Sequence, residues 1–75
     1  MLVRLSDPTL LFELRAYLVA RADCVATAVG PTALDVTILG SYNTEAMGME
    51  TQLRVRAWEE GQRARGVDVR VCWPG

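Results

Sequence analysis

At 75 residues, the chain is long enough for one small domain and too short for two. Apolar residues make up 51% of it, and eight arginines against nine acids leave a net charge of −1, which excludes the charged, apolar-poor composition of a disordered segment. The sequence has no histidine, the commonest general base and metal ligand near neutral pH, so its composition disfavours enzymes and metal-binding proteins. We expect a non-catalytic globular domain without a cofactor.

The amino-terminal segment argues against a membrane protein. Arg4 and a helix-start signal at Asp7 interrupt it, and no run of 18 apolar residues occurs anywhere in the chain. A membrane span or a signal peptide would need a longer uninterrupted apolar segment. We therefore expect a cytoplasmic protein that makes no membrane contact.

The first elements expected are a strand over residues 1–5 and a helix over 8–22. Alternating apolar residues predict the strand. Asp7 followed by Pro8 is typical of a helix start, because the carboxylate accepts a hydrogen bond from a free backbone N–H and proline has none to leave unpaired. The residues of this helix expected to face the core share helical spacing and are Leu11, Leu14 and Leu18.

Two segments rich in β-branched residues follow, over 24–30 and 33–40, and the turn residues between them predict a hairpin. In its second arm, Leu34, Val36 and Ile38 share one face, which we expect to be buried. A second helix should begin at Asn43 or Thr44 and run to about Arg63. A last strand is expected over 67–71, with Val67, Val69 and Val71 inward.

The predicted order of elements is therefore βαββαβ. A crossover helix in each half and a central hairpin favour an α+β ferredoxin-like sandwich that spans residues 1–75 as one domain. In that fold, four antiparallel strands lie in the order 4-1-3-2, and both helices cover one face of the sheet.

The two cysteines are predicted to be free thiols. Cys24 and Cys72 fall on the two outer strands of the expected sheet, about 14 Å apart at ~4.8 Å per strand, which is too far for a disulfide. Two thiols without histidine also do not make a complete zinc site.

The corner from Gly40 to Asn43 lies where the third strand meets the second helix, and it has two interpretations. The free N–H groups of a helix start can bind an anion or another ligand, which would make Gly40, Ser41, Tyr42 and Asn43 a binding corner. Alternatively, Asn43 or Thr44 caps the helix and Tyr42 packs on the core. A single glycine and no basic residue favour this structural interpretation.

The uncovered face of the expected sheet bears on nucleic-acid binding. RNA-binding modules of this topology stack bases on aromatic side chains of that face. Here the outward residues carry charges of both signs and no aromatic ring, which disfavours nucleic-acid binding. They are Arg4, Asp35, Thr37, Asp68, Arg70 and Cys72.

The second helix carries two apolar stripes. At helical spacing, Met49, Leu53 and Ala57 are expected to face the sheet, while a second stripe containing Trp58 points outward. Tryptophan is enriched among interface hot spots, so we expect a homodimer. The expected interface residues are Phe12, Val19, Met47, Val55 and Trp58. In the alternative interpretation, the helix is rolled and both stripes are half buried in their own domain.

The segment LVRLSDPTLLFELRAYL resembles the opening of an ACT domain, a regulatory βαββαβ module. Asp7, Pro8, Leu10 and Leu11 follow the outline of the family's D-x-P-G-x-L motif, and Thr9 stands near the position of the family's glycine. The chain is also similar, through its LGSYN corner and the ME…LR…W pattern, to short actinobacterial proteins of unknown function. The ACT resemblance implies a regulatory domain that binds a small ligand and acts on a separate protein.

Three function classes follow. The leading prediction is a small non-catalytic homo-oligomeric interaction module, which forms a homodimer and could also bind an unidentified protein partner. The alternative is an ACT-type ligand-binding regulatory domain that acts on a separate partner protein. A weak nucleic-acid binder is the third class.

Overall fold

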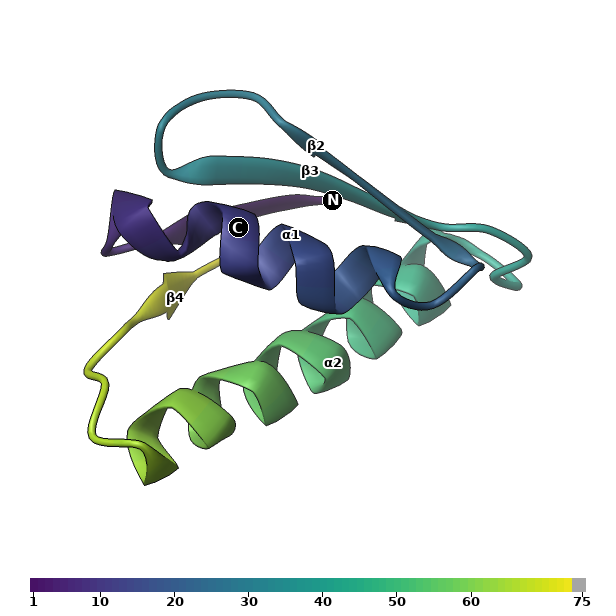
Figure 1. Ribbon diagram of the computed structural model, residues 1–75. Helices are drawn as coiled ribbons and strands as arrows, with labels where there is room; N and C mark the ends of the chain where they lie inside the picture. Colours follow the sequence, from purple (N-terminus) through teal and green to yellow (C-terminus); the bar gives the residue numbers. More distant parts are fainter. Residues whose placement is uncertain (74–75) are drawn as a thin grey trace.

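A computed structural model describes residues 1–73 of the chain. Its strands and helices follow one another in the order that the sequence predicts (Figure 1). The molecule measures 35 × 24 × 24 Å along its principal axes. In chain order the elements are β1 (Leu2–Leu5), the 3-10 helix η1 (Pro8–Leu10), α1 (Leu11–Val19), β2 (Cys24–Ala28), β3 (Ala33–Ile38), α2 (Thr44–Ala64) and β4 (Val71–Cys72).

The strands form one open sheet in the order β2-β3-β1-β4, and all neighbouring strands are antiparallel. Read from the β4 edge, the same neighbours are 4-1-3-2. Val3 of β1 lies opposite Leu34 of β3, and Cys24 of β2 lies opposite Ile38. The predicted α+β class with a four-stranded antiparallel sheet is therefore confirmed.

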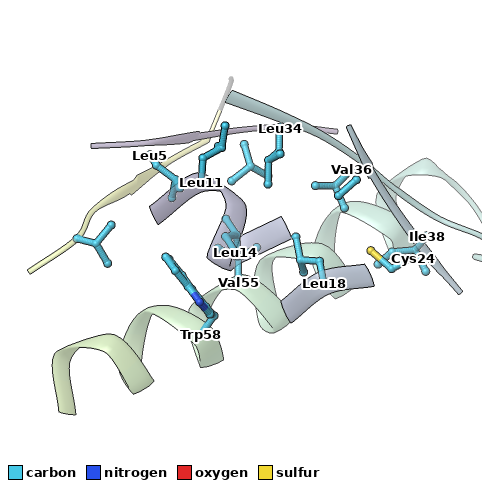
Figure 2. Packing of buried hydrophobic residues seen from close by; sticks show 13 residues of the cluster. Leu5, Leu11, Leu14, Leu18, Cys24, Leu34, Val36, Ile38, Val55 and Trp58 are labelled. Carbon is cyan, nitrogen blue, oxygen red and sulfur yellow. The ribbon is translucent and has the colours of Figure 1, made fainter. Parts of the chain in front are cut away.

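Both helices lie on the same side of the sheet, and the core fills the space between these two layers (Figure 1, Figure 2). The predicted inward residues Leu34, Val36 and Ile38 of β3 are buried. Leu11, Leu14 and Leu18 of α1 are also buried, as their helical spacing predicts. The rest of the cluster consists of Val3, Leu5, Cys24, Ala26, Val55, Trp58 and Val69.

The predicted Asp7 cap is present, but it caps the 3-10 helix η1 that leads into α1, whereas α1 itself begins at Leu11 without a side-chain cap and is shorter than expected. Asp7 Oδ1 accepts hydrogen bonds from Thr9 N at 2.9 Å and from Thr9 Oγ1 at 2.6 Å, and these bonds hold the pKa of the Asp7 carboxyl below its usual value. The helix ends at Val19 rather than near residue 22. A turn follows in which Cys24 N donates to Arg21 O, so the chain reverses into β2.

The roll of α2 about its axis differs from the prediction. Met49 and Leu53, expected to face the sheet, are 63% and 68% exposed. Val55 and Trp58, expected to point outward, are 0% and 5% exposed and belong to the core (Figure 2). Thr51 and Gln62 are buried with them, at the helical spacing that completes one stripe.

Two hydrogen bonds explain why this mixed stripe is the buried one. Thr51 Oγ1 donates to Met47 O at 2.7 Å, and Gln62 Nε2 donates to Glu13 Oε1 at 2.8 Å, so these polar side chains have partners inside the fold. A buried polar group with a partner avoids most of its desolvation cost. The large apolar surface of Trp58 then favours this roll of the helix, because burying it removes more area from water than burying Met49 would.

The last strand is also shorter than predicted. Val67 N donates to Gln62 O and Gly66 N donates to Arg63 O, so the backbone just after α2 stays bonded to the end of the helix. Pairing with β1 therefore includes only Val71 and Cys72. Of the three valines predicted to face inward, Val69 is fully buried, whereas Val67 and Val71 are half-buried.

Both cysteines are free thiols, as predicted. Cys24 is buried on β2 and Cys72 is exposed on β4, at opposite edges of the sheet. Burial raises the pKa of the Cys24 thiol. Within residues 1–73, neither helix is long and apolar enough to cross a membrane.

Candidate functional site

The five residues of the predicted interface do not form one surface. Val55 and Trp58 lie in the core, so the prediction that they line an interface is wrong. Met47 is half-buried and packs against the same cluster. Phe12 and Val19 of α1 remain exposed, Phe12 at 70%.

Phe12 and Val19 also lie on the flank of α1 that is turned away from α2. Arg15 shares this flank, and its Nε donates to Ala26 O of β2 at 2.9 Å. The opposite flank of α1 carries Glu13 and Tyr17, which face α2 across a cleft. Phe12 and Val19 are therefore separated from the exposed apolar residues of α2, because the body of α1 lies between them.

A different apolar surface takes the place of the predicted one. We call it the outer stripe of α2, and it consists of Ala46, Met49, Leu53, Ala57 and Ala64. Taking Ala46 as zero, Ala64 lies at the same angle, Leu53 and Ala57 lie about 20° to either side, and Met49 lies about 60° away. Ala46 is half-buried and the other four are exposed, on the face of α2 opposite its buried stripe.

One flank of the outer stripe carries opposite charges at its two ends. Glu45 is in the first turn of α2 and Arg63 is in the last, 18 residues or about five turns later, so both lie at the same angle on the helix. Both side chains are exposed. The distance from an Arg63 amino nitrogen to Glu59 Oε1 is 3.8 Å, which is long for an ion pair and indicates a weak one.

An open cleft of about 430 Å³ lies between α1 and α2. Its lining residues are Glu13, Tyr17, Ala57, Trp58, Gly61, Gln62 and Arg65. Glu13 Oε1 accepts from Gln62 Nε2 at 2.8 Å and from an Arg65 amino group at 2.9 Å. These bonds, with the Gln62 bond the stronger influence, hold the pKa of the Glu13 carboxyl below its usual value. Glu13, Gln62 and Arg65 thus bind one another and join the two helices.

A second polar contact joins α2 to the start of β2. Arg54 donates two hydrogen bonds to the Asp23 carboxylate, at 3.1 and 3.0 Å, and a third to Glu50 at 2.8 Å. Its hydrogen bond to Asp23 is the main reason that the pKa of the Asp23 carboxyl is low and that of the Arg54 guanidinium is high. The Glu50–Arg54 spacing indicates an i,i+4 pair in the sequence, whereas the tertiary contact with Asp23 has no sequence signal.

The corner from Gly40 to Asn43 has the features of a structural turn. Asn43 Oδ1 accepts from Ala46 N at 2.7 Å and so caps α2, and Gly40 has a φ of +78°, in the region that favours glycine. Ser41 Oγ is buried without a hydrogen-bond partner in the described residues. Tyr42 is 94% exposed, so the expectation that it packs on the core is wrong.

The uncovered face of the sheet carries both signs of charge, as predicted. The six expected outward residues, Arg4, Asp35, Thr37, Asp68, Arg70 and Cys72, are all exposed, although Asp68 and Arg70 precede β4 and lie outside the sheet. Val25 of β2, also exposed, adds an apolar side chain. Asp35 Oδ1 accepts from the Met1 amino group at 3.2 Å.

The polar groups are thus spread over the fold, and those of Glu13, Asp23 and Arg54 are bound to structural partners, whereas Ser41 Oγ and Trp58 Nε1 are buried without one in the described residues. Among residues 1–73, no group of three or more His, Cys, Asp or Glu side chains could hold a metal ion. The strongest unpartnered feature is the outer stripe, which the sequence shows as a pattern but assigns to the wrong face. Comparison with protein-family models, with curated proteins and with solved structures finds no match.

Proposed function

We propose that the protein is a small non-catalytic interaction module that binds a second copy of itself through the outer stripe of α2. The observation that carries the proposal is the exposure of Met49 and Leu53 on one long helix whose opposite face is already buried in the core. Apolar side chains that lie singly on a surface are ordinary. Here they share one stripe with Ala46, Ala57 and Ala64, which is the pattern of a helix that packs on both sides.

The finer fold assignment belongs to the same proposal. The antiparallel order β2-β3-β1-β4, with a helix after β1 and another after β3, supports a ferredoxin-like sandwich. Because both helices cover one face of the sheet, the helical layer is the side on which two such domains would meet. The two free thiols fit the cytoplasmic location that the sequence predicts.

The alternative functions have weaker support. At the corner, Ser41 Oγ is buried without a partner in the described residues, but the Asn43 side-chain oxygen is already used to cap α2 and the corner has no basic residue for an anionic ligand. A nucleic-acid partner would meet Asp35 and Asp68 beside the arginines of the open sheet face. Self-association is therefore the function that we propose.

Two matched variants test the proposal by sedimentation velocity. Leu53→Glu places a charge in the middle of the outer stripe without touching the core, so it should give a folded monomer. Phe12→Glu makes the same kind of change at an equally exposed apolar residue on α1, and it should leave the dimer intact. Circular dichroism melting of both variants checks that each remains folded.

The opposite results would indicate a different interface. A Phe12→Glu monomer together with a Leu53→Glu dimer would place the interface on the α1 flank and contradict the use of the outer stripe. Equal dimerisation of both variants and the wild type would exclude both helices as the contact.

A further inference from the structure

On the basis of the proposed self-association, we infer that two α2 helices pair antiparallel about a two-fold axis that passes at the level of Val55. The partner is a second copy of this chain, and Leu53 of each copy packs beside Ala57 of the other. The inference goes beyond the existence of a dimer, because it states which residues of the two copies lie together.

The spacing along the outer stripe supports the antiparallel arrangement. Ala46, Leu53, Ala57 and Ala64 are separated by 7, 4 and 7 residues, a pattern that reads the same in both directions from position 55. An antiparallel two-fold pair therefore places Leu53 at the level of the partner's Ala57, and Ala46 at the level of the partner's Ala64. Each large side chain then lies beside a small one, which allows close helix packing.

In a parallel pair, by contrast, each residue meets its own copy. The two Leu53 side chains would then share one level, and each alanine would face an alanine. The large side chains would hold the two helices apart where the alanines need close approach. The distribution of large and small residues thus favours the antiparallel pair.

The charges on the flank of the outer stripe support the same arrangement. In an antiparallel pair, the two-fold axis is perpendicular to the plane of the two helices, so the same flank of both copies lies on the same side of the pair. Glu45 of one copy then lies near Arg63 of the other, with an offset of about 3 Å along the helix axis. This happens at both ends of the pair. A parallel pair has its two-fold axis along the helices and would place the two flanks on opposite sides of the pair, so Glu45 of one copy would not meet Arg63 of the other.

Near the centre, the two Arg56 side chains approach each other on this flank. Glu60 lies four residues after Arg56 on the same helix, at a spacing that permits an i,i+4 pair, and it is exposed between Leu53 and Met49 at about 40° from Ala46. The other flank faces α1 and the turn after it, where Arg65 binds Glu13 of α1 and Arg54 binds Asp23 just before β2. The two sheets then lie on the outside of the dimer.

Cysteine cross-linking tests the orientation. Ala46→Cys and Ala64→Cys are made separately and together in a Cys72→Ser background, which removes the exposed native thiol. In the antiparallel pair, residue 46 meets residue 64 of the partner, whereas two copies of residue 46 are about 27 Å apart along the helix. A disulfide requires a Cα separation below about 7 Å.

We expect disulfide-linked dimers on non-reducing gels from the double variant and from an equal mixture of the two single variants. Each single variant alone should stay unlinked. Efficient linking of either single variant alone would indicate a parallel pair and overturn the inference. Absence of linking in a protein that sediments as a dimer would also overturn it and leave self-association standing, whereas a wild-type monomer would overturn the proposed function itself.

Discussion

At the scale of single residues, Gly40 is the position where backbone conformation matters most in the corner before α2. Its φ of +78° lies in the left-handed region, and no atom lies within 4 Å of the position that a Cβ would occupy. A side chain there would therefore be strained by the backbone alone.

We expect Gly40→Ala to lower the free energy of unfolding by about 1 kcal/mol, because alanine disfavours this φ. Urea unfolding followed by circular dichroism measures the change. Gly30→Ala is the matched control, because Gly30 also has open space around it but does not have a positive φ. Equal stability of the two variants would show that the backbone at Gly40 is not strained by a side chain.

The location of Trp58 could not be predicted from its residue type. Tryptophan is common in interfaces and in cores, and its type alone does not distinguish them. In this fold it is 5% exposed and belongs to the core cluster (Figure 2). A charge placed at Trp58 would therefore unfold the domain rather than separate two folded copies.

At the scale of elements, the positions of the strands and helices follow from local signals. The Asp7–Pro8 helix start, the alternation in β3 and the Asn43 cap are all present in the sequence as short patterns. The ends of elements were less predictable. The short β4 results from backbone bonds between Val67 and the end of α2, which no local pattern indicates.

The roll of α2 could not be obtained from its own sequence, because the helix has two apolar stripes. The stripe that is buried contains Thr51 and Gln62, and the exposed one contains Met49 and Leu53, so apolar character alone favours the wrong face. The choice depends on Glu13 of α1, which supplies a partner for Gln62. Contacts between elements that are far apart in the chain therefore determine which stripe of α2 is exposed.

The contact of Asp23 with Arg54 links the start of β2 to α2, and a prediction about pH follows from it. Because the folded state lowers the pKa of Asp23, the stability from this contact is present above the ordinary carboxyl pKa of about 4. As the pH falls below that value, the carboxylate becomes protonated and this stability is lost. Glu13, whose pKa is also lowered, acts in the same direction.

We therefore expect the free energy of unfolding to fall as the pH is lowered from about 5 to about 2. Asp23→Asn should flatten part of this slope, and Arg54→Gln should remove a similar part because it takes away the partner of the carboxylate. Urea unfolding at a series of pH values measures both slopes. Unchanged slopes in both variants would mean that this contact does not contribute to acid sensitivity.

At the scale of the whole molecule, the fold has one covered and one uncovered side of its sheet, and its helical layer has an apolar surface of its own. The buried stripe of α2 completes the core of the monomer, and the outer stripe is left over. In the dimer that we propose, a second copy would supply the same surface, with large side chains where the first copy has small ones. The proposed self-association thus uses residues that the monomer does not need for its own core.

Sedimentation velocity of the wild-type protein at about 100 μM tests this claim most directly, because dimer formation depends on concentration. We expect a species of twice the 8.3 kDa chain mass, which dissociates on dilution. A single species of 8.3 kDa at that concentration would contradict self-association and would leave the outer stripe as a surface for a different protein.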